Sequence, residues 1–354
     1  MSIYIDSEIQ KVIEQKLRAA ITTVVPWVVL AIFLTAVDMH FFAFKFSLNS
    51  FEASLQASQG VLDGLPRWRI YQSRVLGPYL VKWIGQLFGL PPPMAYLSFI
   101  ASCLLITKLI VVRFGLMCTN GVVSTLLMLV SGSLLFSVLL NDPWLYPWDM
   151  TGLVISTIFV VMVLRGVNWP WFIPLVAIAF LNRESGIFIC VWMVAQGWFG
   201  YKNGEGRKPS IGMMVAGGAA ALIGLAMIEL LRNILLVQEF DPASGPITSN
   251  ASWFILQIEN NFWGLVASLT FNSLRLPVIL YIIPLAGITA AVFIGIRGYP
   301  AYTALCLAFG VNLMFIFLFG IVRESRVMID IIPFFSIFLS YIATVEKKDR
   351  CWQK

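Results

Sequence analysis

The chain has 354 residues, 59% hydrophobic and 12% charged, with a formal net charge of +6 and a mean hydropathy of +0.85. So few polar side chains cannot cover a water-soluble globule, and the composition therefore indicates an integral membrane protein. The sequence has no soluble basic domain that would bind a duplex, so we expect no nucleic-acid partner.

Apolar runs near the length of a membrane span recur from about residue 20 to about residue 345. Transmembrane β-strands would instead give short alternating segments, so the predicted fold is all-α, a polytopic bundle of about ten transmembrane helices. The expected spans are residues 19–37, 94–112, 122–140, 151–164, 170–181, 186–199, 211–237, 277–296, 302–320 and 327–345. The lipid bilayer is therefore the first predicted partner.

Residues 1–18 mix charges with regularly spaced isoleucines, which predicts an amphipathic helix on the cytoplasmic surface. Residues 19–345 form one predicted transmembrane domain, and residues 346–354 a cytoplasmic tail. Two long connections are expected on the outer face, at residues 38–93 and 238–276. Loops of this length are usually functional.

The apolar segment 75–89 is short, interrupted by Gly77 and Pro78, and followed by three prolines at positions 91–93. This pattern predicts an interfacial or re-entrant helix that does not cross the membrane. With that assignment, Lys and Arg residues gather on alternate connections, which places both termini in the cytoplasm. Several unusual polar groups then fall together on the outer face, near Asp38 and within residues 67–74, 142–149, 182–184 and 323–326.

Asn182, Arg183 and Glu184 form a polar group between two apolar runs. Helix capping accounts for part of the group, but not for Arg183. An arginine at the outer end of a helix presents a planar fork that suits phosphate or carboxylate. These residues are therefore candidates for substrate binding.

Asp142 and Asp149 lie in a connection rich in proline and aromatic residues, at positions 141–149. An interfacial aromatic belt and a tight turn are the alternative interpretation. Asp149 opens the next predicted helix, where the helix N-terminus favours a carboxylate. We include both acids among the candidate substrate-binding residues.

Arg323, Glu324 and Arg326 separate the last two predicted spans. Snorkelling of arginines to the interface is one interpretation. Binding of phosphate or diphosphate by the two arginines is the other. Asp330, inside the following span, is expected to pair with an arginine of this group, because an unpaired buried carboxylate is costly.

Arg67, Arg69 and Arg74 alternate with aromatic residues in the first outer connection. Such residues can anchor an interfacial helix. Three arginines on the non-cytoplasmic side nevertheless oppose the usual charge distribution, which favours an anionic ligand.

Asp38 stands at the outer end of the first predicted span. Partial desolvation at the membrane boundary would prepare a carboxylate there to act as a general base. Glu52 and Asp63, in the connection that follows, are alternative candidates for that role.

The order of these groups resembles the GT-C superfamily of polytopic membrane glycosyltransferases. The resemblance rests on Asp38, the loop to Ser73, and the short motifs at 74–80, 146–149, 182–186 and 323–326. It implies transfer of a sugar from a polyprenyl-phosphate-linked donor to a glycan or lipid acceptor on the outer face. The family often has paired acids near the position of Asp38, which here stands alone.

The reaction implied by the resemblance inverts the anomeric carbon, with Asp38 as the base and arginines stabilising the departing phosphate. No cofactor is indicated, although a divalent metal is compatible with the residues. A bacterial inner membrane with the site facing outward is the expected location. A polymerase or ligase that uses lipid-pyrophosphate-linked glycans remains an alternative, as does a transporter or flippase of lipid-linked sugars.

Overall fold

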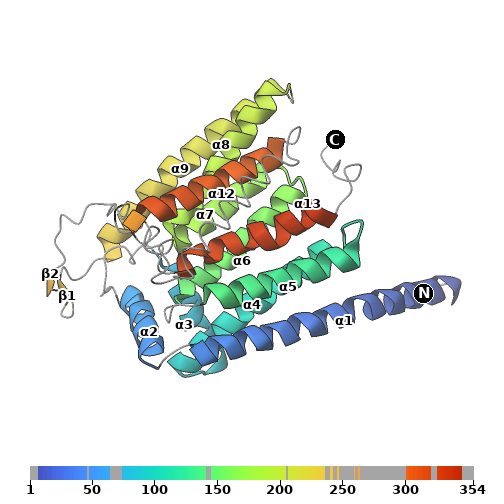
Figure 1. Cartoon of the computed structure of the whole chain (residues 1–354), viewed down its shortest axis with the longest axis horizontal. Helices are drawn as coiled ribbons and strands as arrows, with labels where there is room; N and C mark the ends of the chain where they lie inside the picture. Colours follow the sequence, from blue (N-terminus) through green and yellow to red (C-terminus); the bar gives the residue numbers. More distant parts are fainter. Residues whose placement is uncertain are drawn as a thin grey trace, which may run out of the picture.

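The computed structural model describes a helical protein whose long helices lie side by side in one bundle (Figure 1). It describes residues 7–45, 48–63, 74–140, 145–204, 206–235, 240–241, 245–246, 259, 262–263, 300–319 and 325–344. A pair of two-residue antiparallel strands, β1 (Phe240–Asp241) and β2 (Gly245–Pro246), is added to the helices.

The helices follow one another along the chain with short connections between most of them. The α-helices are α1 (Ser7–Lys45), α2 (Leu48–Leu62), α3 (Leu76–Phe88), α4 (Pro92–Gly115), α5 (Gly121–Leu139), α6 (Pro147–Leu164), α7 (Phe172–Asn182), α8 (Ile187–Lys202), α9 (Arg207–Leu235), α12 (Pro300–Phe319) and α13 (Ser340–Thr344). Four further helical segments lie between them. These are the 3₁₀ helices η2 (Trp169–Trp171), η3 (Glu184–Gly186) and η4 (Ser325–Ile331), and the π-helix η5 (Phe334–Leu339).

Among the described residues, six helices are long and apolar enough to cross a membrane. The six segments are Val24–Lys45, Pro92–Gly115, Gly121–Leu139, Pro147–Leu164, Arg207–Leu231 and Ala301–Leu318. Two shorter apolar helices, Trp169–Asn182 and Met328–Thr344, lie among them. The expectation of a helical integral membrane protein is therefore confirmed, while the total of about ten spans stays a prediction.

The first helix differs from the sequence-based expectation. Instead of a surface helix that ends at residue 18 and a span that ends at residue 37, α1 continues from Ser7 to Lys45. Asp38 consequently lies inside the helix, about two turns before its end, and not at the boundary of the span. The position of Asp38 matters because its surroundings are those of the bundle, not of an outer loop.

The two helices that follow α1 are short. α3 has 13 residues, about 20 Å of helix, which is less than the thickness of the hydrocarbon core. Gly89 follows its last residue, and the left-handed φ of 63° at this position suits glycine. Pro92 then opens α4 at a position where the missing N–H is not needed.

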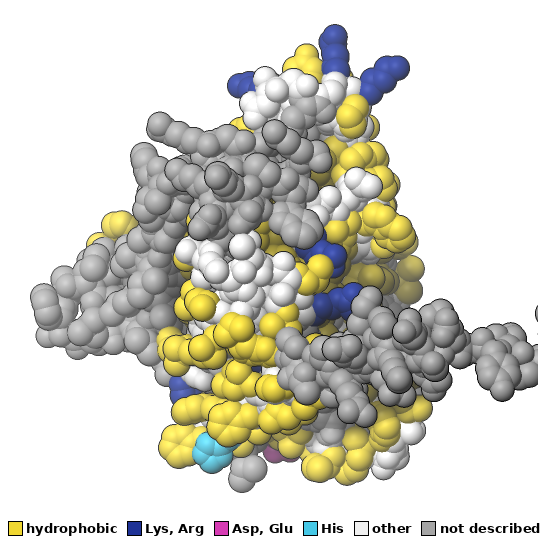
Figure 2. Space-filling model, turned by 90° about the vertical axis from the view of Figure 1, so that its right-hand side faces the viewer, with side chains coloured by type: hydrophobic (Ala, Val, Ile, Leu, Met, Phe, Trp, Pro, Cys, Tyr) yellow, Lys and Arg dark blue, Asp and Glu magenta, His cyan; other side chains and the backbone are white. Residues whose placement is uncertain are grey.

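The bundle has two distinct ends. In Figure 1, α2 and α3 lie at the left-hand end, whereas the start of α1, the turn from α8 to α9 and the end of α13 lie at the right. At the right-hand end, Arg113, Arg165, Lys202, Arg207 and Lys208 are exposed. Figure 2, which views this end, shows Lys and Arg side chains standing among hydrophobic ones.

The core is centred on α6. In its span, 72% of the residues are buried, against 22% for the spans in α1 and α9, which therefore lie at the periphery. Phe159 of α6 packs edge to face on both Phe172 and Trp192, which ties α6 to α7 and α8. The first turn of this central helix carries the residues of the candidate site.

Candidate functional site

The first turn of α6 is a fixed platform at the left-hand end of the bundle in Figure 1. Pro147 opens the helix, and the Oδ2 atom of Asp149 accepts a hydrogen bond of 3.1 Å from the Tyr146 backbone N–H. This contact satisfies a backbone group that a helix start would otherwise leave free, and the helix dipole favours the carboxylate there. Trp148 is fully buried and stacks on Tyr146, with ring centroids 4.6 Å apart.

The turn between α7 and α8 is held against this platform. Asn182, the last residue of α7, is 1% exposed, and its Nδ2 atom donates a hydrogen bond of 2.9 Å to the Trp148 carbonyl. Arg183 follows in an extended conformation, with φ of −168°, before η3 begins. The polar group 182–184 is therefore not only a helix cap, because it links α7 to the start of α6.

Arg183 contacts two carboxylates from different parts of the chain. Its Nη1 atom lies 3.4 Å from Oδ1 of Asp149 and 3.7 Å from Oδ2 of Asp330 in η4. Both aspartates are buried. A single guanidinium thus supplies the positive charge between two acids that would otherwise repel each other in a medium of low polarity.

A second arginine completes the group. The Nη2 atom of Arg74, just before α3, lies 3.3 Å from Oε2 of Glu184. The Arg74 guanidinium also lies over the Trp148 ring, 5.5 Å from its centroid, a favourable cation–π arrangement. We call Arg74, Asp149, Arg183, Glu184 and Asp330 the end cluster; it joins α3, α6, the α7–α8 turn and η4.

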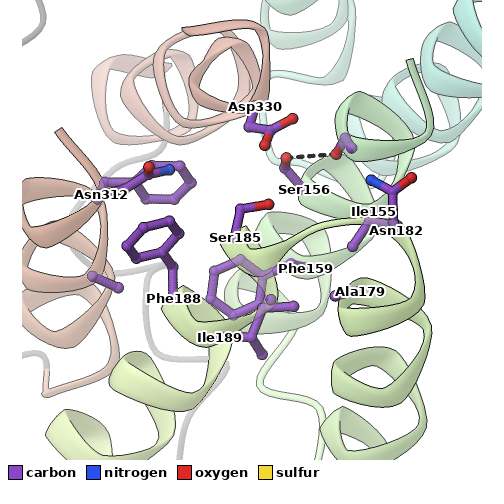
Figure 3. Close-up of a pocket in the computed structure, with 14 residues that line it drawn as sticks. Ile155, Ser156, Phe159, Ala179, Asn182, Ser185, Phe188, Ile189, Asn312 and Asp330 are labelled. Carbon is purple, nitrogen blue, oxygen red and sulfur yellow. Dashed lines mark hydrogen bonds between the residues drawn. The ribbon is translucent and has the colours of Figure 1, made fainter. Parts of the chain in front are cut away.

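A cavity lies beside the end cluster, between α6, α7, α8, α12 and η4. Its volume is about 40 Å³, enough for a few water molecules. Figure 3 shows Asp330, Ser156 and Ser185 facing one another on one side of it, with Asn312 on the α12 side. Phe159, Phe188, Phe309, Ile155 and Ile189 supply most of the apolar wall.

Two buried oxygens at this cavity lack a hydrogen-bond partner among the residues that the structure describes. They are Oδ1 of Asp330 and Oδ1 of Asn182, on side chains that both line the cavity. Ser156, by contrast, donates its hydroxyl proton to the Gly152 carbonyl at 2.8 Å, leaving only its oxygen as an acceptor. Buried polar atoms are nearly always paired, so a free acceptor facing a cavity indicates room for a donor group.

Asp38 makes a different set of contacts. Its Oδ2 atom lies 2.5 Å from Nζ of Lys108 in α4 and 3.3 Å from the Ser133 hydroxyl in α5. Asp38 is 1% exposed and does not line the cavity. Its role as the base stays a prediction, but the structure does not bring it to the end cluster.

The alternative acids of the first outer connection are Glu52, in α2, and Asp63, just after the end of α2, and both are exposed. Both carboxylate oxygens of Asp63 accept hydrogen bonds of 3.0 Å from Gln59. Of the predicted substrate-binding residues, the structure thus unites Arg74, Asp149, Asn182, Arg183 and Glu184. Arg67, Arg69, Asp142, Arg323 and Glu324 lie outside the described residues, as does the side chain of Arg326.

Sequence reasoning placed Asp330 beside the arginines at 323–326, whereas its described partner is Arg183, which precedes it by about 150 residues. It also overlooked Lys108 and Asn312. Lys108 interrupts an otherwise apolar run, which is a signal for a buried pair. Asn312 gave no comparable signal, because a single amide in an apolar helix is compatible with many roles.

Within the described part of the chain, no group of three or more His, Cys, Asp or Glu side chains is placed to hold a metal ion. The end cluster instead offers cationic forks for an anion, carboxylates for a proton, and a small cavity beside them. No protein-family model matches the chain, and comparisons with curated proteins and with solved structures give no significant match.

Proposed function

We propose that the chain is a membrane glycosyltransferase of the GT-C type, which transfers a sugar from a polyprenyl-phosphate-linked donor to a glycan or lipid acceptor. The observation that carries the proposal is the end cluster, in which Arg74 and Arg183 meet three carboxylates at one end of a membrane bundle. The resemblance of the motif order to that superfamily supplies the reaction class.

The distribution of charge supports an outward-facing site. The exposed Lys and Arg residues at the opposite end of the bundle, seen in Figure 2, are those expected on the cytoplasmic side. The end cluster would then face the outer side of the membrane, in bacteria the periplasm. A polyprenyl-linked donor keeps its lipid in the bilayer and its phosphate at this level.

The arginines have the chemistry that the departing phosphate requires. As the bond from the sugar to the phosphate breaks, negative charge grows on the phosphate oxygen, and a guanidinium held in place by carboxylates stabilises it without rearrangement. Arg183 is held by Asp149 and Asp330, and Arg74 by Glu184 and Trp148. Both side chains are therefore oriented before any substrate arrives.

The proposal is tested with purified protein in lipid vesicles that contain polyprenyl-phosphate-linked hexoses or pentoses. We expect one of these donors to release polyprenyl phosphate, and Arg183→Ala to reduce the release. Arg165→Ala is the matched control, because this arginine is exposed at the opposite end of the bundle.

Two results would contradict the proposal. Elongation of pyrophosphate-linked glycans, without release of phosphate from any monophosphate donor, would identify a polymerase or ligase. Movement of intact donor across the vesicle membrane would identify a transporter. The location of the end cluster at one end of the bundle, and not at mid-depth where transporters bind substrate, favours the transferase.

A further inference from the structure

The carboxylates of the end cluster are not equivalent. Asp149 uses one oxygen to cap the start of α6 and directs the other toward Arg183. Glu184 is paired with Arg74, and its side chain is 27% exposed. Neither acid lines the cavity.

Asp330 differs from both. One of its oxygens lies 3.7 Å from Arg183, while the other, Oδ1, faces the cavity without a partner among the described residues. Figure 3 shows the carboxylate pointing toward Ser156 and Ser185. A group held by a cation on one side and open on the other can accept a proton without leaving its place.

Gly152 in α6 permits this position of the carboxylate. A Cβ atom added there would lie 2.2 Å from Oδ1 of Asp330, much closer than any real contact. The absence of a side chain at residue 152 therefore allows the carboxylate to lie against α6, where both Gly152 and Asp330 line the cavity. Asp38 also has an oxygen, Oδ1, without a partner among the described residues, but Asp38 is paired with Lys108 and does not line this cavity.

The rest of the cavity suits the reacting part of a carbohydrate. Asn312 and the Ser156 oxygen can orient a hydroxyl group, and Phe159, Phe188 and Phe309 can pack on the adjacent carbon atoms. A volume of about 40 Å³ admits a hydroxyl group and its carbon, not a whole sugar ring. The remainder of the acceptor would lie outside the cavity.

We infer that this cavity receives the acceptor hydroxyl and that Asp330, not Asp38, is the general base; the inference rests on the proposed glycosyl transfer. The acceptor oxygen forms a bond to the anomeric carbon, and the bond from that carbon to the phosphate oxygen breaks. The bonding pair leaves with polyprenyl phosphate, beside Arg183. The hydroxyl proton passes to Oδ1 of Asp330.

The decisive experiment compares Asp330→Asn with the wild-type protein, using the donor from which the wild-type protein releases phosphate. We expect transfer to alcohol acceptors to fall by roughly 10²-fold to 10⁴-fold, the usual contribution of a general base. Transfer to azide should be little changed, because this anion attacks without losing a proton. Binding of polyprenyl phosphate should also be retained. Glu229→Gln serves as a carboxylate-to-amide control, because Glu229 lies in α9, does not line the cavity and is not part of the end cluster.

Gly152→Ala provides a second test, in which the carboxylate is kept but displaced. We expect the same loss with alcohols and the same retention with azide. The inference is overturned if Asp330→Asn keeps transfer to alcohols, or if it loses transfer to both alcohols and azide while still binding polyprenyl phosphate. It is also overturned if only Asp38→Asn loses transfer to alcohols and keeps transfer to azide. If the wild-type protein releases no phosphate from any donor, the proposed function itself fails.

Discussion

This bundle contains two groups of buried charges, which differ in how their opposite charges are paired. The pair of Asp38 and Lys108, with Ser133 beside it, joins α1, α4 and α5 through one acid and one base. The end cluster joins four parts of the chain, with Arg183 contacting two acids and a cavity alongside. Both groups remove ions from water, which is costly unless the partners are well placed.

The difference shows which group is organised for a ligand. The Asp38–Lys108 pair is balanced in charge, and both side chains are at least nine-tenths buried. Each group has an aspartate oxygen, Oδ1 of Asp38 or of Asp330, that lacks a hydrogen-bond partner among the described residues, but only Asp330 lines the cavity. The end cluster also has more carboxylates than arginines. We therefore expect the pair to hold helices together and the end cluster to bind and react.

The largest effect is expected from Arg183→Ala, which leaves both Asp149 and Asp330 without their shared cation. The free energy of unfolding should fall by about 5 kcal/mol, the upper part of the range for breaking a buried ion pair. Release of phosphate from the donor should be lost as well. Thermal unfolding in detergent and the release assay measure the two effects.

Arg183→Lys is the informative companion to that variant. It keeps the charge but not the planar fork, and so cannot serve two carboxylates equally well. An intermediate loss of stability is expected. If Arg183→Lys behaves as the wild-type protein does in both assays, the planar guanidinium is not needed to contact both carboxylates. The end cluster would then not differ from the Asp38–Lys108 pair in this respect.

A smaller effect, about 3 kcal/mol, is expected from Lys108→Met, which strands one carboxylate inside the bundle. The double variant Asp38→Leu with Lys108→Met should recover stability to within about 1 kcal/mol of the wild-type protein, because a well-packed apolar pair can replace a buried ion pair. It should also retain glycosyl transfer. A folded but inactive double variant would instead support Asp38 as the base.

The fold class could be predicted from composition and periodicity, since long apolar runs leave few alternatives to transmembrane helices. A short helix in the segment 75–89 was also expected, from Gly77, Pro78 and the three prolines that follow, and α3 has 13 residues; its interfacial position stays a prediction. The extent of α1 was not. The sequence predicts a span that ends just before Asp38, whereas the pairing of Asp38 with Lys108, 70 residues away, allows the helix to continue past it.

The site could be predicted in part, because local patterns select residues but not their partners. Arg183 and Asp149 were both selected from their own motifs, and the structure brings them together across 34 residues. The contact between Arg183 and Asp330 depends on how α6, the α7–α8 turn and η4 pack. Asn312 can be recognised as a cavity residue only from the structure, in which α12 lies against the same cavity.

Gly77→Ala tests whether the end cluster depends on close packing of α3. A Cβ atom at residue 77 would lie 2.7 Å from the backbone of Pro147 and Trp148, which cannot move easily. The free energy of unfolding should fall by about 2 kcal/mol, as is usual for overpacking. Gly218→Ala is the matched control, because nothing lies within 4 Å of a Cβ atom there; a stability loss of the same size in that control would remove the packing explanation.

The smallest effect is expected from Glu184→Gln, at the exposed edge of the end cluster. Its side chain is 27% exposed and pairs with Arg74, which keeps its contact with the Trp148 ring when the charge is removed. Solvent weakens such a pair, so the loss should be about 0.5 kcal/mol and should shrink further at high salt. Thermal unfolding at low and high ionic strength measures it. A loss in the free energy of unfolding as large as that of Arg183→Ala would contradict this expectation. It would mean that solvent does not weaken the Arg74–Glu184 pair and that the pair stabilises the protein as strongly as the buried pairs do.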